Sequence, residues 1–398
     1  MQNIHSCALT GGGKCGIIKG AYQISLCMEI VMGFSDILFI VFVAFAVLGG
    51  VDYILSNRFG LGKAFERGIV TMGPLALAMT GMIVLAPVLA DVLSPVVVPV
   101  FNWMGVDPAM FAGSLLACDM GGAPLADKLT SDPQGAVLGG IVCASLLGAT
   151  ITFTIPVAMG ILKEEDRPFA AKGILCGIIT VPLGIFAGGL VAGIPVSKVL
   201  WNLLPTLAPA LLIALGLWKF ERLIIRLFTY FGRFMTALAT FGLLAALIQK
   251  FTPWTFIHGL APVGEAFQVV GEIALLLAGA FPLMHLVSKA LSKPLLAVGR
   301  KLRVNETSMT GLLTTTVNSI ATFDSLEKMD PRGKVLNMAF AVSAAFVFGD
   351  HLAFTGGWNP SAIPALIVAK LTAGVTALLL AFLMTADADR SAERQRES

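Results

Sequence analysis

Asp119 stands out among the residues that could do chemistry, because the sequence around it is apolar. It closes the stretch 110–118 (MFAGSLLAC), and Gly121, Gly122 and Pro124 follow it. Glycine and proline break helices, so the chain is predicted to leave its helix just after this carboxylate. At membrane depth a carboxylate costs about 2.5–3.5 kcal/mol on insertion scales and needs a partner, water or a ligand. Asp119 is therefore predicted to be the counter-ion of a cationic substrate or coupling ion; the alternative is a helix cap that accepts backbone N–H groups.

A second polar stretch, 311–319 (GLLTTTVNS), offers hydroxyl and amide groups instead of a carboxylate. The internal repeat described below places Asp119 opposite Val317, one position from Asn318. We therefore expect the two polar stretches to meet as an Asp–Asn pair rather than as two carboxylates.

Asp350 and His351 form a third candidate, beside glycines and the aromatic residues Phe354 and Trp358. Neighbouring Asp and His side chains could bind a cation or relay protons, since unperturbed histidine titrates at about pH 6.5. Two alternatives stay open. Asp350 could form an ion pair with Lys370 in the last apolar segment, and His351 could make an interfacial hydrogen bond.

Other catalytic or metal chemistry finds no support in the sequence. The six cysteines form no C-x-x-C pair and no histidine cluster joins them. They are interpreted as small buried side chains, and no metal site is predicted. The sequence holds no nucleophile–base pair, nucleotide-binding motif or soluble catalytic domain. It therefore predicts neither an enzyme nor a pump, and no cofactor.

The composition indicates the environment of these residues. The chain has 398 residues, of which 57% are hydrophobic and only 13% charged, and its mean hydropathy is +0.87. Soluble domains carry about 25% charged residues. These values exclude a nucleic-acid binder, a disordered chain and a secreted disulfide scaffold. They predict an all-α polytopic protein embedded in a lipid bilayer.

Nine apolar segments are predicted to be transmembrane helices, since each approaches or exceeds the length needed to cross a hydrocarbon core of about 30 Å. They are 35–55, 69–91, 136–161, 169–194, 200–218, 227–250, 266–288, 335–350 and 361–385. Two shorter and more polar stretches, 109–126 and 307–325, are predicted to be re-entrant elements. Non-helical backbone is tolerated at membrane depth only where protein or a cavity surrounds it.

The placement of basic residues favours this topology. Lys and Arg gather in cytoplasmic loops. With both short stretches re-entrant, the basic loops 218–234 and 288–307 lie in the cytoplasm; if both stretches crossed fully, these loops would lie outside. The prediction puts the N-terminus outside and the C-terminus in the cytoplasm.

The two halves of the chain match at an offset of 198 residues. Residues 132–138 (DPQGAVL) correspond to 330–336 (DPRGKVL). The alternative is coincidence among Leu, Ala and Gly. The match predicts repeats over 32–194 and 227–385, a linker helix over 195–226 and a cytoplasmic tail over 386–398. An odd number of crossings separates the repeats, so they are predicted to be inverted, which is a transporter architecture.

The stretches 110–122 (MFAGSLLACDMGG) and 332–352 (RGKVLNMAFAVSAAFVFGDHL) resemble the ethanolamine permeases of bacterial ethanolamine-utilisation operons. The resemblance extends from about residue 32 to about residue 385. It implies uptake of ethanolamine across the inner membrane, to supply a cobalamin-dependent lyase in the cytoplasm. Residues 1–31 lie outside the resemblance and are expected to be a disordered extension upstream of a native start at Met32.

Ethanolamine is a primary amine, protonated at pH 7 by analogy with the lysine side chain at about 10.4. We hypothesise that Asp119 faces its ammonium group, and that Asn318 with Thr315 or Ser319 hydrogen-bonds its hydroxyl. Phe354 or Trp358 could add a cation–π attraction of about 0.5–2 kcal/mol.

The energy source stays open between a uniporter and a carrier with proton coupling through Asp350 and His351. Three rival functions are a cation-coupled transporter of another small amine, amino alcohol or amino acid, a membrane enzyme acting on lipid head groups, and a channel. The sequence does not decide the oligomeric state, and a homo-oligomer stays open.

Overall fold

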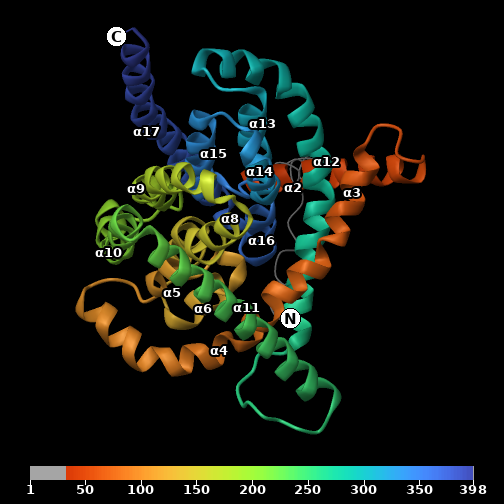
Figure 1. The fold of residues 1–398 in the computed structure, drawn as a ribbon. Coiled ribbons are helices and arrows are strands. Elements are labelled where there is room, and N and C mark those ends of the chain that lie inside the picture. The colour runs from red at the N-terminus through yellow and green to blue at the C-terminus, as the bar shows by residue number, and fades with distance from the viewer. Residues whose placement is uncertain (1–32, 398) are drawn as a thin grey trace, which may run out of the picture.

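The computed structural model describes residues 33–397, and their regular structure is entirely helical. The expected extension 1–31 and the expected start at Met32 lie outside the described residues. Figure 1 shows the helices gathered around short central segments, with α12 along one side and α17 projecting at the C-terminal end.

Eight helical runs among the described residues are long and apolar enough to cross a membrane. This confirms an all-α polytopic membrane protein. The runs are built from α2 (Phe34–Ile54), α3 with α4 (Leu61–Val70, Met72–Trp103), the run Pro133–Ile161, α9 (Arg167–Val191), α10 (Val196–Lys219), α11 (Glu221–Phe251), α12 (Val263–Leu302) and α17 (Ile363–Glu397).

The prediction of one continuous transmembrane helix over 335–350 is wrong. The chain forms α15 (Pro331–Ala344), leaves helical geometry over 345–349, and resumes as α16 (Asp350–Trp358). Ala345 leaves helical geometry with ψ of 138°, and Phe346 follows in a left-handed conformation with φ of 62°. The helix therefore ends although the segment contains no proline. This break becomes part of the candidate site.

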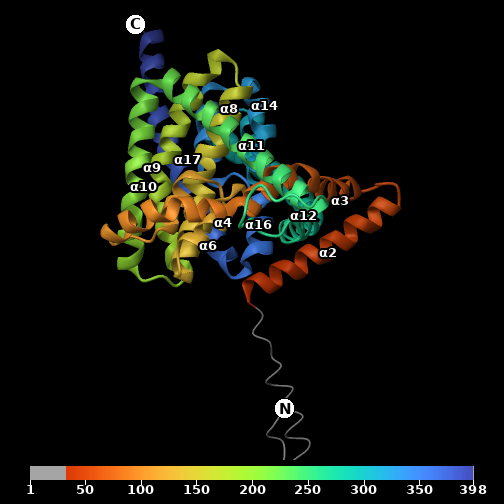
Figure 2. The ribbon, with the colours of Figure 1, turned by 90° about the horizontal axis from the view of Figure 1, so that it is seen from below.

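Two spans are much longer than predicted. The segment expected over 69–91 belongs to α3 and α4, which extend together over 61–103 with three prolines inside α4. Helix α12 has 40 residues, so at 1.5 Å per residue it is about 60 Å long, twice the hydrocarbon thickness. Figure 2 shows α9, α10 and α17 side by side, with α2 and α4 crossing their direction steeply.

Both stretches expected to be re-entrant are pairs of short helices that pack against each other. The first contains α5 (Ala109–Leu115), the 3₁₀ turn η1 (Cys118–Met120) and α6 (Gly122–Leu129). The second contains α13 (Glu306–Val317) and α14 (Ser319–Ser325). Both stretches are interrupted, but the first breaks before Asp119 rather than just after it, because Leu116 and Ala117 take extended backbone and end α5 at Leu115. Entry and exit on one side of the membrane stays a prediction.

Equivalent residues of the two halves make equivalent contacts, which supports the repeat. Gly81 of α4 lies so close to the Ala239 carbonyl of α11 that a Cβ would overlap it, and Gly279 of α12 lies equally close to the Phe42 carbonyl of α2. The offset of 198 residues relates Gly81 to Gly279. Each half therefore packs a helix onto the other half, α4 on α11 and α12 on α2.

The starts of the following helices correspond as well. The run Pro133–Ile161 opens with α7 (Pro133–Ala136), capped by Asp132, and α15 opens with Asp330 as its cap. Both carboxylates accept backbone N–H groups, and proline occupies the first turn of both helices. Beyond α7 the first half forms π-helix over Val137–Gly148 (η2) and Thr150–Thr154 (η3), then α8 (Ile155–Ile161). The second half breaks at the corresponding place.

Replacing Gly279 by alanine should destabilise the protein, because the added methyl group would overlap the Phe42 carbonyl. We expect a cost of about 1–3 kcal/mol, seen as a lower unfolding temperature in detergent. The matched control is Gly271→Ala on the same helix, where nothing lies within 4 Å of the new Cβ. Alanine favours helix there, so the control should be neutral or slightly stabilised. Equal effects of the two substitutions would contradict this packing.

Candidate functional site

The break between α15 and α16 docks on the end of α13. The Phe346 N–H donates to the Thr315 carbonyl at 3.1 Å, and the Phe348 N–H donates to the Thr316 carbonyl at 2.8 Å. Gly349 touches the Val317 carbonyl so closely that a side chain there would overlap it. The backbone groups released by one broken helix are thus bonded by another, as an apolar interior requires.

The first half contains a related contact between a break and a distorted helix. The Ala117 N–H, just before η1, donates to the Thr152 hydroxyl at 3.2 Å. Gly148, at the end of the first π-helical segment, lies against the Leu116 carbonyl. π-Helical turns widen a helix and occur often at functional sites. In Figure 1, α16 lies between the α13–α14 pair and the α5–α6 pair, and it contacts η1.

Asp119 of η1 and His351 of α16 meet at the crossing, the place where these two elements contact each other. The Asp119 Oδ1 lies 3.7 Å from the His351 Nε2, and the Asp119 side chain is 14% exposed. Neither the Asp119 Oδ1 nor the His351 Nδ1 has a hydrogen-bond partner within the described part of the chain. Asp350, beside His351, interacts electrostatically with Asp119. Buried polar atoms are almost always bonded, so these open positions suit a polar ligand.

Lys370 of α17 brings a positive charge to the same region. Its side chain is fully buried, and its ammonium group donates to the Ser145 carbonyl at 2.6 Å. It interacts electrostatically with Asp119. Among residues 33–397 no ion pair joins Lys370 to Asp350, which was the alternative reading of that carboxylate.

Cys118 adds a thiol that sequence spacing could not place here. One ligand atom each of Cys118, Asp119 and His351 lie within 4.8 Å of one another. Sulfur, carboxylate and imidazole together are ligands that suit a soft divalent ion. The charge of Lys370 opposes a doubly charged ion at this place.

Asn318 lies at a cavity and not at the Asp119–His351 contact. It lines a cavity of about 550 Å³ together with Thr314, Lys63, Arg67 and His285. Its side-chain oxygen accepts the Ile320 N–H at 2.9 Å, which caps α14. Within the described residues, Asp119 contacts His351 and not Asn318, so the expected Asp–Asn pair is absent.

The other predicted residues surround the crossing. Thr315 is buried and its hydroxyl donates to the Thr322 hydroxyl at 2.9 Å, whereas the buried Ser319 hydroxyl has no partner among the residues described. Phe354 is fully buried and stacks on Trp358 with ring centroids 5.7 Å apart. The Trp358 indole donates to Asp127 of α6 at 2.9 Å. Both rings therefore pack α16 in place.

Comparisons with known proteins agree with this architecture. The family model "Ethanolamine utilisation protein, EutH" matches residues 34–384. The chain belongs to the EutH family. It is 49% identical to a probable ethanolamine permease EutH of Listeria monocytogenes, covering 89% of this chain and 95% of that protein. It is 41% identical to the probable ethanolamine permease EutH of Escherichia coli, covering 91% and 98%. An uncharacterised Bacillus subtilis protein, YxeR, is 44% identical over 89% and 96%. No solved structure matches the chain.

The EutH match includes every residue of the crossing, from Cys118 to Lys370. Membership of a permease family points to a transporter rather than an enzyme.

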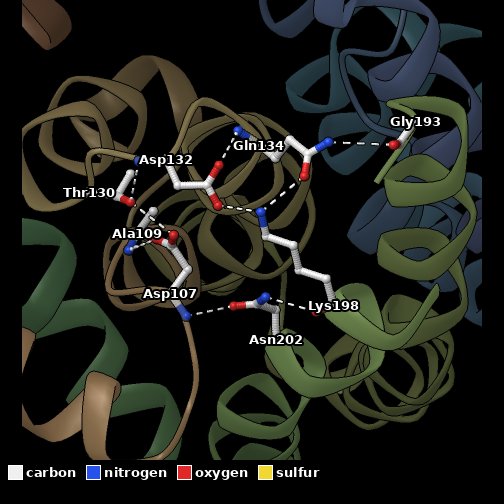
Figure 3. A network of polar contacts seen from close by, with 8 residues as sticks. All are labelled: Asp107, Ala109, Thr130, Asp132, Gln134, Gly193, Lys198 and Asn202. Carbon is white, nitrogen blue, oxygen red and sulfur yellow. Dashed lines mark hydrogen bonds and ion pairs between the residues drawn. The ribbon is translucent and has the colours of Figure 1, made fainter. Parts of the chain in front are cut away.

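A second polar cluster of this EutH-family chain lies at the base of the α5–α6 pair (Figure 3). Lys198 of α10 forms an ion pair with Asp132 and donates to the Gln134 side chain at 3.0 Å. The Asn202 oxygen accepts the Asp107 N–H at 2.7 Å, and Thr130 donates to the Asp107 carboxylate at 2.8 Å. Because these groups bond one another, the cluster fastens α10 to the base of the α5–α6 pair.

The carboxylates of this cluster differ in their pKa. Burial raises the pKa of Asp107. Burial also acts to raise the pKa of Asp132, but the hydrogen bonds from Lys198 and the Gln134 N–H outweigh it and hold that pKa below its ordinary value. Asp132 therefore stays charged at neutral pH and keeps its ion pair with Lys198.

Replacing Lys198 by glutamine should lower the unfolding temperature at pH 7 by about 2 °C, since a half-exposed ion pair contributes up to about 1 kcal/mol. The pKa of Asp132 is lower in the folded protein than in the unfolded chain, where it has its ordinary value of 3.8. The ion pair therefore stabilises the protein fully at pH values above 3.8. That stability is lost as the pH falls through the folded value. Thermal unfolding in detergent between pH 3 and pH 7 measures the effect.

The matched control for Lys198→Gln is Lys128→Gln, because Lys128 is an exposed lysine at the end of α6. The control should unfold like the parent at every pH. A difference between parent and Lys198→Gln that persisted in acid would contradict the assignment to the Asp132 ion pair.

Proposed function

We propose that this chain is a permease that imports ethanolamine, as the protonated amino alcohol, across the bacterial inner membrane. Its relatives named probable ethanolamine permeases are 41–49% identical along nearly their whole length. The long apolar helices supply the membrane-spanning body, and a permease needs a polar place within it for the solute.

The observation that carries the proposal is the open oxygen of Asp119. It lies in the interior of the crossing, near a second carboxylate at Asp350, and accepts no hydrogen bond from the described residues. A primary ammonium has three donors and one positive charge, so it would satisfy this oxygen and still reach a second acceptor. We assign the ammonium of ethanolamine to Asp119, with Asp350 and His351 beside it.

Asn318, Thr315 and Ser319 remain the proposed partners of the hydroxyl group. Ser319 has an unpartnered hydroxyl, and Asn318 faces the cavity. Val317 lines the same cavity and touches Gly349, the neighbour of Asp350. The cavity thus reaches close to the crossing. The rings of Phe354 and Trp358 stack on each other. We therefore assign them a packing role in α16 rather than a cation–π contact with the substrate.

The orientation follows from the positive-inside rule. Lys63 and Arg67 line the cavity and belong to the basic segment 56–68, which the rule places in the cytoplasm. In this arrangement the N-terminus lies outside, the C-terminus lies inside, and the repeats are inverted. The cavity then opens toward the cytoplasm, and its basic lining favours release of a cation over its retention.

The proposal includes two modes of energy supply, a uniporter and a proton-linked carrier. In the second mode a proton is exchanged at the crossing, where Asp350 and His351 were the expected groups. A proton count on substrate binding separates the two modes.

Replacing Asp119 by asparagine should reduce ethanolamine uptake at pH 6 at least about tenfold, because the ammonium loses its buried counter-charge. Labelled uptake into proteoliposomes measures the effect, and the reconstituted amount of each variant is compared. The matched control is Asp91→Asn, an exposed carboxylate on α4 that should leave uptake unchanged. Normal uptake by the Asp119 variant would remove the counter-ion role.

Competition assays separate ethanolamine from the alternative substrates. Propanolamine keeps the primary ammonium and hydroxyl, so it should compete. Choline lacks N–H donors, and serine carries a carboxylate that Asp119 repels, so both should compete weakly. Stronger competition by serine or choline than by propanolamine would favour the alternative, a cation-coupled transporter of another amine or amino acid.

A further inference from the structure

Lys370 is a buried charge that the proposed substrate contacts do not use. Its side chain is 1% exposed on α17, inside the contact with α9, α15 and the π-helix η2. Its one hydrogen bond among the described residues goes to the Ser145 carbonyl. No carboxylate of the described residues lies within 4.0 Å of its ammonium group. A buried ammonium without an ion pair is costly, so its presence calls for a reason.

The groups that interact with Lys370 belong to the candidate site. They are Asp119 and Cys118 from η1 and His351 from α16. Asp119 also interacts with Asp350, which in turn interacts with Arg67 of α3. Asp119 is thus the acidic group that balances the charge of Lys370 across the crossing.

The internal repeat allows the surroundings of this lysine to be compared between the two halves. The offset of 198 residues relates Lys370 to Lys172. Lys172 lies at the periphery, where its ammonium donates to the Met384 carbonyl at 3.0 Å in an exposed setting. The same position therefore holds a peripheral lysine in one half and a central lysine in the other.

Lys370 carries the same chemical group as the proposed substrate. Both are primary ammonium ions, and both are attracted to the Asp119 carboxylate. Two ammonium ions in a region of low dielectric repel each other strongly. When the substrate cation enters, the balance of charge is restored if Lys370 becomes a neutral amine.

We propose that Lys370 is an internal cation that the substrate replaces, and that one proton leaves Lys370 as ethanolammonium binds at Asp119. This inference rests on the proposed function. The step is balanced: a substrate ammonium and a lysine ammonium become a bound substrate ammonium, a neutral lysine amine and a free proton. After the substrate leaves, Lys370 takes up a proton again. A transport cycle with this step exchanges one amine cation for one proton.

The test is calorimetric titration of the purified full-length protein with ethanolamine at pH 7, in two buffers with different ionisation enthalpies. The buffer dependence of the binding heat gives the number of protons released. The parent should release a proton, and its affinity should rise by up to about tenfold per pH unit while Lys370 titrates. Lys370→Met should release none, and its affinity should not change with pH.

Lys370→Arg provides a second variant, because arginine keeps the charge but does not deprotonate in proteins. It should release no proton and bind ethanolamine more weakly at every pH. The matched control, Lys172→Met, should behave like the parent. Proton release from Lys370→Arg equal to that of the parent would assign the proton to His351 or Asp350 and overturn the proposal.

The outcomes separate this inference from the proposed function. A parent that binds ethanolamine without releasing a proton overturns the role of Lys370 and leaves the permease proposal standing as a uniporter. A parent that binds no ethanolamine overturns both.

Discussion

The central constraint on this fold is that interrupted backbone in an apolar interior must find its hydrogen bonds within the protein. The break over 345–349 is possible because the carbonyls of Thr315 and Thr316 accept its N–H groups. The break before η1 is bonded in part by the hydroxyl of Thr152. Each interruption therefore lies against another interrupted or distorted helix. Their meeting point concentrates polar atoms in the centre of an apolar molecule, and the candidate site is a result of that concentration.

Much of the fold could be predicted because its signals are local. Long apolar runs predicted most spans, and Gly121, Gly122 and Pro124 predicted an interruption beside Asp119, although α5 already ends at Leu115 and α6 starts at Gly122. The matching segments 132–138 and 330–336 predicted a repeat, and the structure starts a helix in the same way at both places. Lengths were harder to predict, because helices such as α12 continue past the hydrocarbon core wherever no residue stops them.

The composition of the site could be predicted only in part, because its contacts join distant residues. Asp119 and His351 were both candidates, but nothing local indicates that they touch. The gap-free repeat register suggested Asn318 as the partner, whereas α16 brings His351 to that place. The break over 345–349 had little local signal, since its residues are apolar and free of proline and its one glycine, Gly349, stands at the end. It arises from tertiary hydrogen bonds to α13. Lys370 was considered as a partner of Asp350, but burial beside Ser145 could not be read from the chain.

The crossed packing of the two halves has a consequence for biosynthesis. Helix α2 packs against α12, and α4 packs against α11, through glycines that allow backbone contact. The ribosome makes α2 some two hundred residues before α12. The early helices therefore enter the bilayer before the helices that they finally pack against have been made. Neither half can complete its packing alone. Assembly is set by the last helices to emerge, so a chain truncated at the linker helix would leave contact surfaces that only the missing half can cover.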